Sequence, residues 1–154
     1  MTEEKKPLKG FGRALAVATL VYDYDCVGNS GTNMGYILEN DEAIVVKIDS
    51  GEALPFIDDL KNAKGIKHHP QTRDMVVGTN GTIMSFEELN KNDQKEFIMA
   101  VSDILMASDS QIKEIFKEFL HRDERFKKIL ASLLSRKADF LQAFTPEVRN
   151  KIGE

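Results

Sequence analysis

The feature that most constrains this chain is the helical spacing of apolar residues through its C-terminal half. Over 93–107, apolar side chains recur at the spacing of one helix face, at Phe97, Ala100, Val101, Ile104 and Leu105. Two further stripes follow, Ile112, Ile115, Phe116, Phe119 and Leu120, and then Phe126, Ile129, Leu130, Leu133, Leu134, Leu141 and Phe144. Helices with such stripes pack against one another, so we expect a helical bundle over 85–152 with these side chains in its core.

Residues with capping preferences mark where these helices begin. Ser85 and Glu88 form a capping-box pattern in SFEEL, which predicts helix from Ser85 onward. Ser108 or Asp109 is a suitable N-cap for the next helix. Thr145-Pro146 combines an N-cap with a proline at the first helical position, so we expect a last short helix to open there.

The N-terminal third has a different character. After a polar tail at 1–9, the apolar run 11–22 predicts a buried helix, although its β-branched end, ATLVY, also fits a strand. The runs MGYIL (34–38) and AIVVKI (43–48), separated by ENDE, predict a β-hairpin. The segment 10–54 therefore reads as helix, Gly-rich loop and hairpin.

Two shorter runs, 74–77 and 82–84, predict a second pair of strands around an Asn-Gly turn. A short helix is also expected within 54–62. Taken together, the pattern predicts a single α+β domain, mainly helical, with a small antiparallel β-hairpin in the N-terminal third and a helical bundle after it.

Length, charge and cysteine content exclude several functional classes. A chain of 154 residues, 42% hydrophobic and 30% charged, is typical of one soluble globular domain. Its net charge of −4, without a basic stretch, argues against nucleic acid as a partner. No run approaches the roughly 18 apolar residues of a membrane span, and the polar start does not resemble a secretory signal. The single cysteine, Cys26, excludes an internal disulfide, so we expect a cytoplasmic location.

The residues most suggestive of chemistry flank the predicted hairpin. Asn33 precedes its first strand and Asp49 follows its second, and a hairpin brings its two ends together. Amide and carboxylate oxygens are the ligands that Mg²⁺ prefers, so Asn33 and Asp49 are candidate metal ligands. Asp25 or Asp23, on the loop upstream, would orient or deprotonate a hydroxyl. On the same loop, Gly28 and Gly31 would let backbone N–H groups approach a phosphate.

This arrangement resembles the catalytic segment of the kinase-like superfamily, in its lipid-kinase and HipA-like branches. The matching pieces are NMGYIL (33–38) and VVKIDSGEAL (45–54), which end in an apolar–Ile–Asp–x–Gly run. The string DYDCVGNSGTN is also similar to kinase-like effector proteins of intracellular bacteria, which would be delivered into a host cell. The resemblance implies ATP and magnesium as cofactors, Asn33 and Asp49 as magnesium ligands, and Asp25, or else Asp23, as the catalytic aspartate.

The resemblance covers about thirty residues and departs from the kinase pattern in three respects. The kinase loop places Asp five positions before Asn, whereas Asp25 precedes Asn33 by eight and Asp23 precedes it by ten. No His or Arg accompanies either aspartate. About ten residues precede the first helix, too few for a nucleotide-covering N-lobe. The resemblance therefore implies a C-lobe alone, a fragment or half of a split protein, and it leaves open a degenerate kinase without activity.

The same residues also have purely structural interpretations. Asp and Asn in a Gly-rich loop commonly hydrogen-bond their own backbone. The glycines match neither the P-loop nor the dinucleotide-binding fingerprint, because a strand rather than a helix follows them. Cys26 is expected to be a small buried residue. Tyr22, Tyr24 and Tyr36 would either stack on an adenine or, as is more common, line the core with the hydroxyl at the surface. The competing function is a non-catalytic protein-interaction module that uses the helical bundle as its binding surface.

Overall fold

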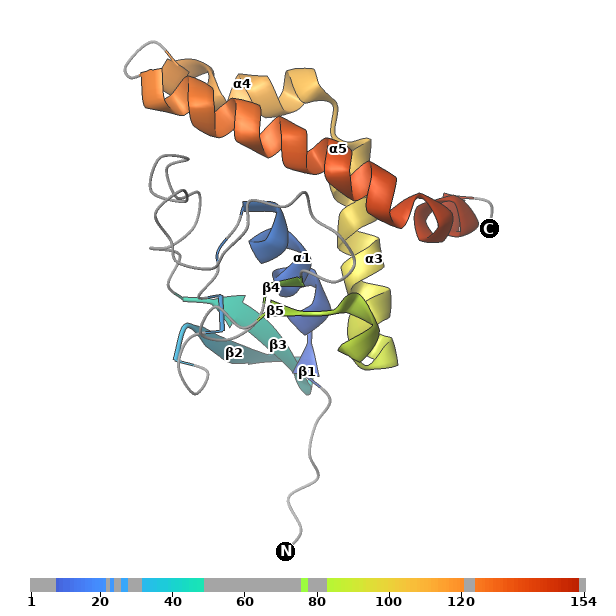
Figure 1. Cartoon of the computed structure of the whole chain (residues 1–154). Coiled ribbons are helices and arrows are strands. Elements are labelled where there is room, and N and C mark those ends of the chain that lie inside the picture. Colours follow the sequence, from blue (N-terminus) through green and yellow to red (C-terminus); the bar gives the residue numbers. More distant parts are fainter. Residues whose placement is uncertain are drawn as a thin grey trace, which may run out of the picture.

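The chain folds into a small sheet, an apolar helix packed against it, and three longer helices that extend away from it (Figure 1). The computed structural model describes residues 8–21, 23, 26–27, 32–48, 76–77, 83–120 and 124–152. Their elements are β1 (Leu8–Lys9), α1 (Phe11–Val21), β2 (Met34–Glu39), β3 (Glu42–Lys47), β4 (Val76–Val77), β5 (Ile83–Met84), a 3₁₀ turn η2 (Phe86–Glu88), α3 (Lys91–Met106), α4 (Asp109–Leu120) and α5 (Glu124–Ile152). The predicted α+β class, mainly helical with a hairpin near the N-terminus, is confirmed.

The sheet is built on the predicted hairpin. Strands β2 and β3 pair antiparallel from Met34↔Lys47 to Glu39↔Glu42, and the two residues between them, Asn40 and Asp41, both adopt positive φ. Asn and Asp tolerate that conformation, which suits the twist of a two-residue hairpin. One strand was not expected: Leu8 and Lys9, assigned to a polar tail, form β1 and pair parallel to β3.

The second predicted strand pair is present in its described part. Val77 lies opposite Ile83 in the antiparallel pair β4–β5. The Asn-Gly turn between these strands and the short helix expected within 54–62 lie outside the described residues.

Helix α1 is apolar and has no acidic side chain in its first turn and no basic one in its last turn. Residues far away in the sequence supply the negative charge at the start of α1 and the positive charge at its end. Glu96 of α3 accepts hydrogen bonds from Gly10 N (2.8 Å) and Gly12 N (3.1 Å) at the start of α1. Arg136 of α5, itself buried, donates from Nη1 to the Leu20 carbonyl oxygen (3.3 Å) at its end. An anion at the N-terminus and a cation at the C-terminus are the charges that complement a helix dipole.

Helices α1 and α3 approach so closely that only glycine fits at the contact. A Cβ added to Gly12 would lie 2.0 Å from the Asp93 backbone oxygen. The close approach of Gly12 to Asp93 sets the position of α1 against the helical part of the molecule.

The Asp93 carboxyl has a raised pKa in this position. Burial, and then the negative charge of Glu96 nearby, raise its pKa above the ordinary value.

The core between these helices is a cluster of phenylalanines. Phe86, Phe97, Phe140 and Phe144 are buried, and their ring centroids lie 5.3–6.3 Å apart in tilted or edge-to-face pairs. Leu15, Ala16 and Ala18 of α1 pack into the same cluster. The residues come from α1, η2, α3 and α5, so this cluster joins the N-terminal and C-terminal parts of the chain.

Two of the predicted helix starts differ from expectation. Ser85 N donates to Glu88 Oε2 (2.6 Å), yet this pair opens only the 3₁₀ turn. The Gln94 side-chain nitrogen bonds the carbonyl oxygens of Phe86, Glu87 and Leu89, and α3 begins after a separate N-cap, Asn90.

The expected helix start at Thr145-Pro146 is also wrong, since α5 runs through it without a break. Proline inside a helix costs about 3 kcal/mol because it removes a backbone donor. Phe144 and Val148, on either side of Pro146, are both buried, and their burial offsets this cost. Thr145 Oγ1 bonds the Leu141 carbonyl oxygen one turn earlier.

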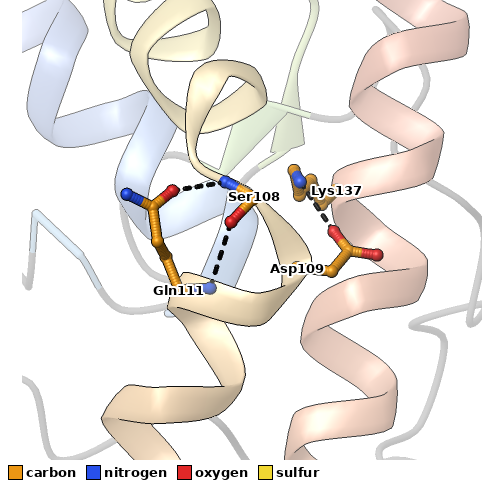
Figure 2. Close-up of polar contacts among 4 residues, drawn as sticks. All are labelled: Ser108, Asp109, Gln111 and Lys137. Carbon is orange, nitrogen blue, oxygen red and sulfur yellow. Dashed lines mark hydrogen bonds and ion pairs between the residues drawn. The ribbon is translucent and has the colours of Figure 1, made fainter.

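The start of α4 is held by two hydrogen bonds and an ion pair, drawn in Figure 2. Ser108 Oγ accepts from Gln111 N (3.2 Å), and Gln111 Oε1 accepts from Ser108 N (2.7 Å), which makes Ser108 the N-cap. Asp109 binds Lys137 of α5 through a 2.7 Å contact between Oδ1 and Nζ. The Lys137 ammonium holds the pKa of the Asp109 carboxyl below its ordinary value. Helix α4 therefore lies along α5 (Figure 1).

This packing covers one side of α4 and leaves apolar residues outside. Ile115 and Leu141, predicted in the core, are exposed, as is Met106 at the end of α3. The prediction was wrong for Ile115 and Leu141 because α4 and α5 extend beyond the sheet and α1. No described element covers the outer sides of these two helices (Figure 1).

We predict that Glu96→Ala lowers the free energy of unfolding by about 3 kcal/mol, because it leaves two part-buried N–H groups without their charged acceptor. Glu96→Gln, which keeps one acceptor oxygen, should lose roughly half as much. Urea denaturation measures both. The exposed Glu118 of α4 provides a matched control, and Glu118→Ala should change stability by less than about 0.5 kcal/mol. A Glu96→Ala loss as small as the control's would contradict the capping role.

We also predict a pH-dependent contribution from Asp109. Its pKa is lowered in the folded state, so its stabilising contribution is present above the unfolded pKa and is lost as pH falls through the folded pKa. The melting temperature of Asp109→Asn should therefore lie below that of the wild-type protein at neutral pH, and the two should converge in acid. Glu118→Gln should show no such convergence, and a constant Asp109→Asn difference at every pH would contradict the prediction.

Candidate functional site

The candidate site lies where α1 ends and the β2–β3 hairpin opens. Asp23 follows α1, and its backbone N–H donates to the Ala18 carbonyl oxygen (2.8 Å), which closes the last turn of the helix. Cys26 N then donates to Asp23 O (3.2 Å). The described part of the loop is thus folded back onto the helix end, and Cys26 is buried, as predicted.

Asn33 closes the open end of the hairpin. Its backbone N–H donates to Val27 O (3.1 Å), and its carbonyl oxygen accepts from Ile48 N (3.0 Å). The Thr32 hydroxyl lies 3.5 Å from Asn33 Oδ1. Ile48 is the last described residue before the Asp-Ser-Gly segment.

An ion pair between Asp23 and Lys47 lies beside this closure. Lys47 ends β3, opposite Met34, and its Nζ lies 3.2 Å from Asp23 Oδ2. Asp23 is 4% exposed and Lys47 is 21% exposed in their side chains. Lys47 Nζ is shielded from water and makes no hydrogen bond of good geometry to any described residue, so its contact with Asp23 is electrostatic rather than directed. Removal of either partner would leave a charge without its counter-charge in a shielded position.

The structure describes two of the predicted site residues, Asp23 and Asn33, and brings both to the open end of the hairpin. Asp25, Gly28, Gly31 and Asp49 lie outside the described residues. Asp23 is buried and paired with a lysine, whereas a base must reach a substrate hydroxyl. Its placement therefore favours a structural role for Asp23 and leaves Asp25 as the candidate base.

Lys47 is the site residue that the sequence interpretation missed. It is the single charged residue in the apolar run AIVVKI, and a lysine in a strand otherwise rich in Val and Ile is a usable signal of a buried counter-charge. The sequence around Asp23, which lies ten residues before Asn33, does not indicate that it pairs with Lys47.

The described residues contain no group of three His, Cys, Asp or Glu side chains placed to hold a metal ion. None of the described helices has the length and apolar character that crossing a membrane requires.

Comparison with protein-family models, with curated proteins and with solved structures found no match to this chain.

We predict that Asp23→Ala lowers the free energy of unfolding by about 3–5 kcal/mol, because it leaves Lys47 shielded from water without its counter-charge. The double variant Asp23→Ala/Lys47→Met should recover most of this loss, since both charges are gone. Urea denaturation of the single and double variants measures the coupling.

The exposed pair Glu124–Lys127, whose charged atoms lie 2.5 Å apart, is the matched control. Breaking it with Glu124→Ala should cost less than about 1 kcal/mol, as is usual for surface ion pairs. An Asp23→Ala loss within that range, or a double variant less stable than Asp23→Ala, would contradict the account of this pair.

Proposed function

We propose that the chain is a nucleotide- or phosphate-binding domain related to the C-lobe of kinase-like proteins, with its site at the open end of the β2–β3 hairpin. The observation that carries the proposal is the backbone hydrogen bond between Asn33 O and Ile48 N. It joins the two segments on which the sequence resemblance rests, NMGYIL and VVKIDSGEAL, at Asn33 and at Ile48, which precedes the expected ligand Asp49 in the sequence.

The donor chemistry of these residues fits a magnesium ion. Asn33 and Asp49 would supply one amide and one carboxylate oxygen, and Mg²⁺ is commonly bound by one or two carboxylates together with waters and substrate phosphates. When bound, magnesium neutralises charge on the β- and γ-phosphates.

The sequence resemblance suggests roles for Asp25, Gly28 and Gly31, which lie outside the described residues, and the ion pair suggests one for Asp23 and Lys47. Asp25 would accept the proton of a phosphate-accepting hydroxyl in an active enzyme, and Gly28 and Gly31 would allow backbone N–H groups close to phosphate oxygens. Asp23 and Lys47 would hold the end of α1 against β3, so that Asn33 and the loop keep their positions. A degenerate member would keep binding and lack phosphoryl transfer.

Calorimetric titration tests the proposal. We predict that the wild-type chain binds ATP in the presence of magnesium, and that Asn33→Ala and Asp49→Asn each weaken binding at least tenfold, about 1.4 kcal/mol. Removal of magnesium with a chelator should weaken binding in the wild-type protein more than in Asp49→Asn.

The exposed residues Asn92 and Glu118 give matched controls, because Asn92→Ala and Glu118→Gln repeat the chemical change away from the site. Both should bind as the wild-type protein does. Absence of binding to ATP, ADP and inorganic phosphate, with or without magnesium, would overturn the proposal.

A second candidate function is a non-catalytic protein-interaction module, of the kind found in effector proteins. The observation in its favour is the exposure of apolar side chains on the helices, at Met106, Ile115 and Leu141. The same titration separates the two functions. If the folded chain binds no nucleotide, the interaction module is the function that fits. Nucleotide binding that depends on Asn33 and Asp49 supports the first proposal.

A further inference from the structure

The outer edge of β2 is a row of backbone groups that face away from the sheet. The strand order β1-β3-β2 places β2 at the edge. Because Asn33 O bonds Ile48 N, the hydrogen-bonded pairs of the ladder fall at every second residue from Asn33, and Gly35, Ile37 and Glu39 point their backbone groups toward β3. Met34, Tyr36 and Leu38 therefore direct N–H and C=O groups to the open edge.

This edge lacks the features that usually prevent strands from pairing with other chains. The six residues MGYILE contain no proline and no lysine or arginine, and their register with β3 is unbroken by a bulge. Within the part of the chain that the structure describes, no residue hydrogen-bonds to the outward groups of β2. Tyr36, Ile37 and Leu38 are 63%, 50% and 66% exposed, so the expectation that Tyr36 lines the core was wrong. An exposed, apolar edge strand of this kind is suited to pair with another strand.

We infer that β2 pairs antiparallel with β2 of a second copy of this chain, about a twofold axis beside Ile37. This inference rests on the edge and outer face of the hairpin and is independent of the proposed nucleotide site. Twofold pairing places one surface patch against itself, so the patch must be self-complementary. With Ile37 opposite Ile37, Tyr36 lies opposite Leu38, and Glu39 lies opposite Gly35.

The charges and side-chain sizes along β2 favour this register over its neighbours. A register centred on Leu38 would place Glu39 opposite Ile37, and one centred on Tyr36 would leave Ile37 opposite Gly35, which has no side chain. The register centred on Ile37 pairs Ile37 with Ile37 and Tyr36 with Leu38, leaves only Glu39 opposite Gly35, and brings no two like charges together. Apolar cross-strand pairs of this kind stabilise a sheet. Tyr36 and Leu38 also lie at outward-facing positions, so their backbone groups can complete the new ladder.

The outer face of the hairpin adds a second reason for self-association. Ile37, Ile44 and Val46 lie on one face of the sheet, by the alternation of the strands, and Ile48 packs over Gly35 beside them. Water reaches all four side chains, fully or in part. Pairing at β2 would bring two copies of this cluster side by side in one six-stranded sheet, with the two Ile37 side chains in contact at its centre.

Sedimentation of the full chain over a range of concentrations tests the inference. We expect a dimer that dissociates on dilution, and Leu38→Pro should raise its dissociation constant at least about tenfold. The Leu38 N–H faces the open edge, so proline there removes an intermolecular donor while the bonds to β3 remain. Tyr36→Lys, a second variant, should weaken the dimer by charge and lost apolar contact.

The matched control is Ile115→Lys, which places the same charge on an exposed apolar position of α4. It should leave the dissociation constant unchanged, and circular dichroism should show all three variants folded. A monomer at every concentration would overturn the inference. So would a dimer that survives both β2 variants, because another surface would then hold it.

A cysteine at position 37 tests the register directly. Non-hydrogen-bonded antiparallel pairs bring Cα atoms to about 4.5 Å, within the range of a disulfide, so Ile37→Cys should form a covalent dimer with oxidised glutathione. The wild-type protein, whose single Cys26 is buried, should not, and neither should Ile115→Cys. Equal cross-linking at positions 37 and 115 would contradict a specific β2 interface.

Discussion

The rest of the structure depends on how α1 is held at both of its ends. The helix carries almost no charge that could satisfy its own termini, and Glu96 and Arg136 satisfy them from α3 and α5. The residues lie more than eighty and more than a hundred positions from the backbone groups that they bind. These contacts therefore form only when the N-terminal and C-terminal parts of the chain are folded together, and they couple helix formation to tertiary structure.

This coupling positions the candidate site. The C-terminal end of α1 holds Asp23, and Asp23 holds Lys47 of β3. The hairpin is thereby fixed against the helix at the same end where Asn33 meets Ile48. In our proposal the buried ion pair is thus a support for the neighbouring residues, which would contact a nucleotide. The opposite arrangement, with Asp23 exposed and reactive, does not fit its burial.

The sequence predicted those elements whose signals are local. The apolar run 11–22 folds into α1 over Phe11–Val21, and Asn40 and Asp41 form the hairpin turn. Both the helix and the turn depend on residues that are neighbours in the chain. Interactions between distant segments were not predictable in the same way. Helix α5 continues past Pro146 because its flanking residues are buried in the core, and this burial outweighs a local stop signal.

At the candidate site, too, the sequence predicted local contacts and did not predict contacts between distant segments. The sequence predicted that Asn33 and Asp49 meet at the open end of the hairpin. The structure shows Asn33 bonded to Ile48, as the hairpin register requires, and the position of Asp49 stays a prediction because it lies outside the described residues. The partners of Lys47, Glu96 and Arg136 depend on how α1 packs against the sheet and the other helices, and no periodicity encodes that packing. The exposure of Ile115 and Leu141 was missed for the same reason, since an apolar stripe does not specify how much of it a neighbour covers.

The most direct test of the central proposal is to follow the backbone amide resonances of the ¹⁵N-labelled chain as ATP and magnesium are added. The account predicts saturable shifts at Asn33, Lys47 and Ile48, at the open end of the hairpin, with little change at the hairpin turn, Asn40 and Asp41. Shifts confined to the helices, or no saturable shift at all, would contradict a nucleotide site at this position.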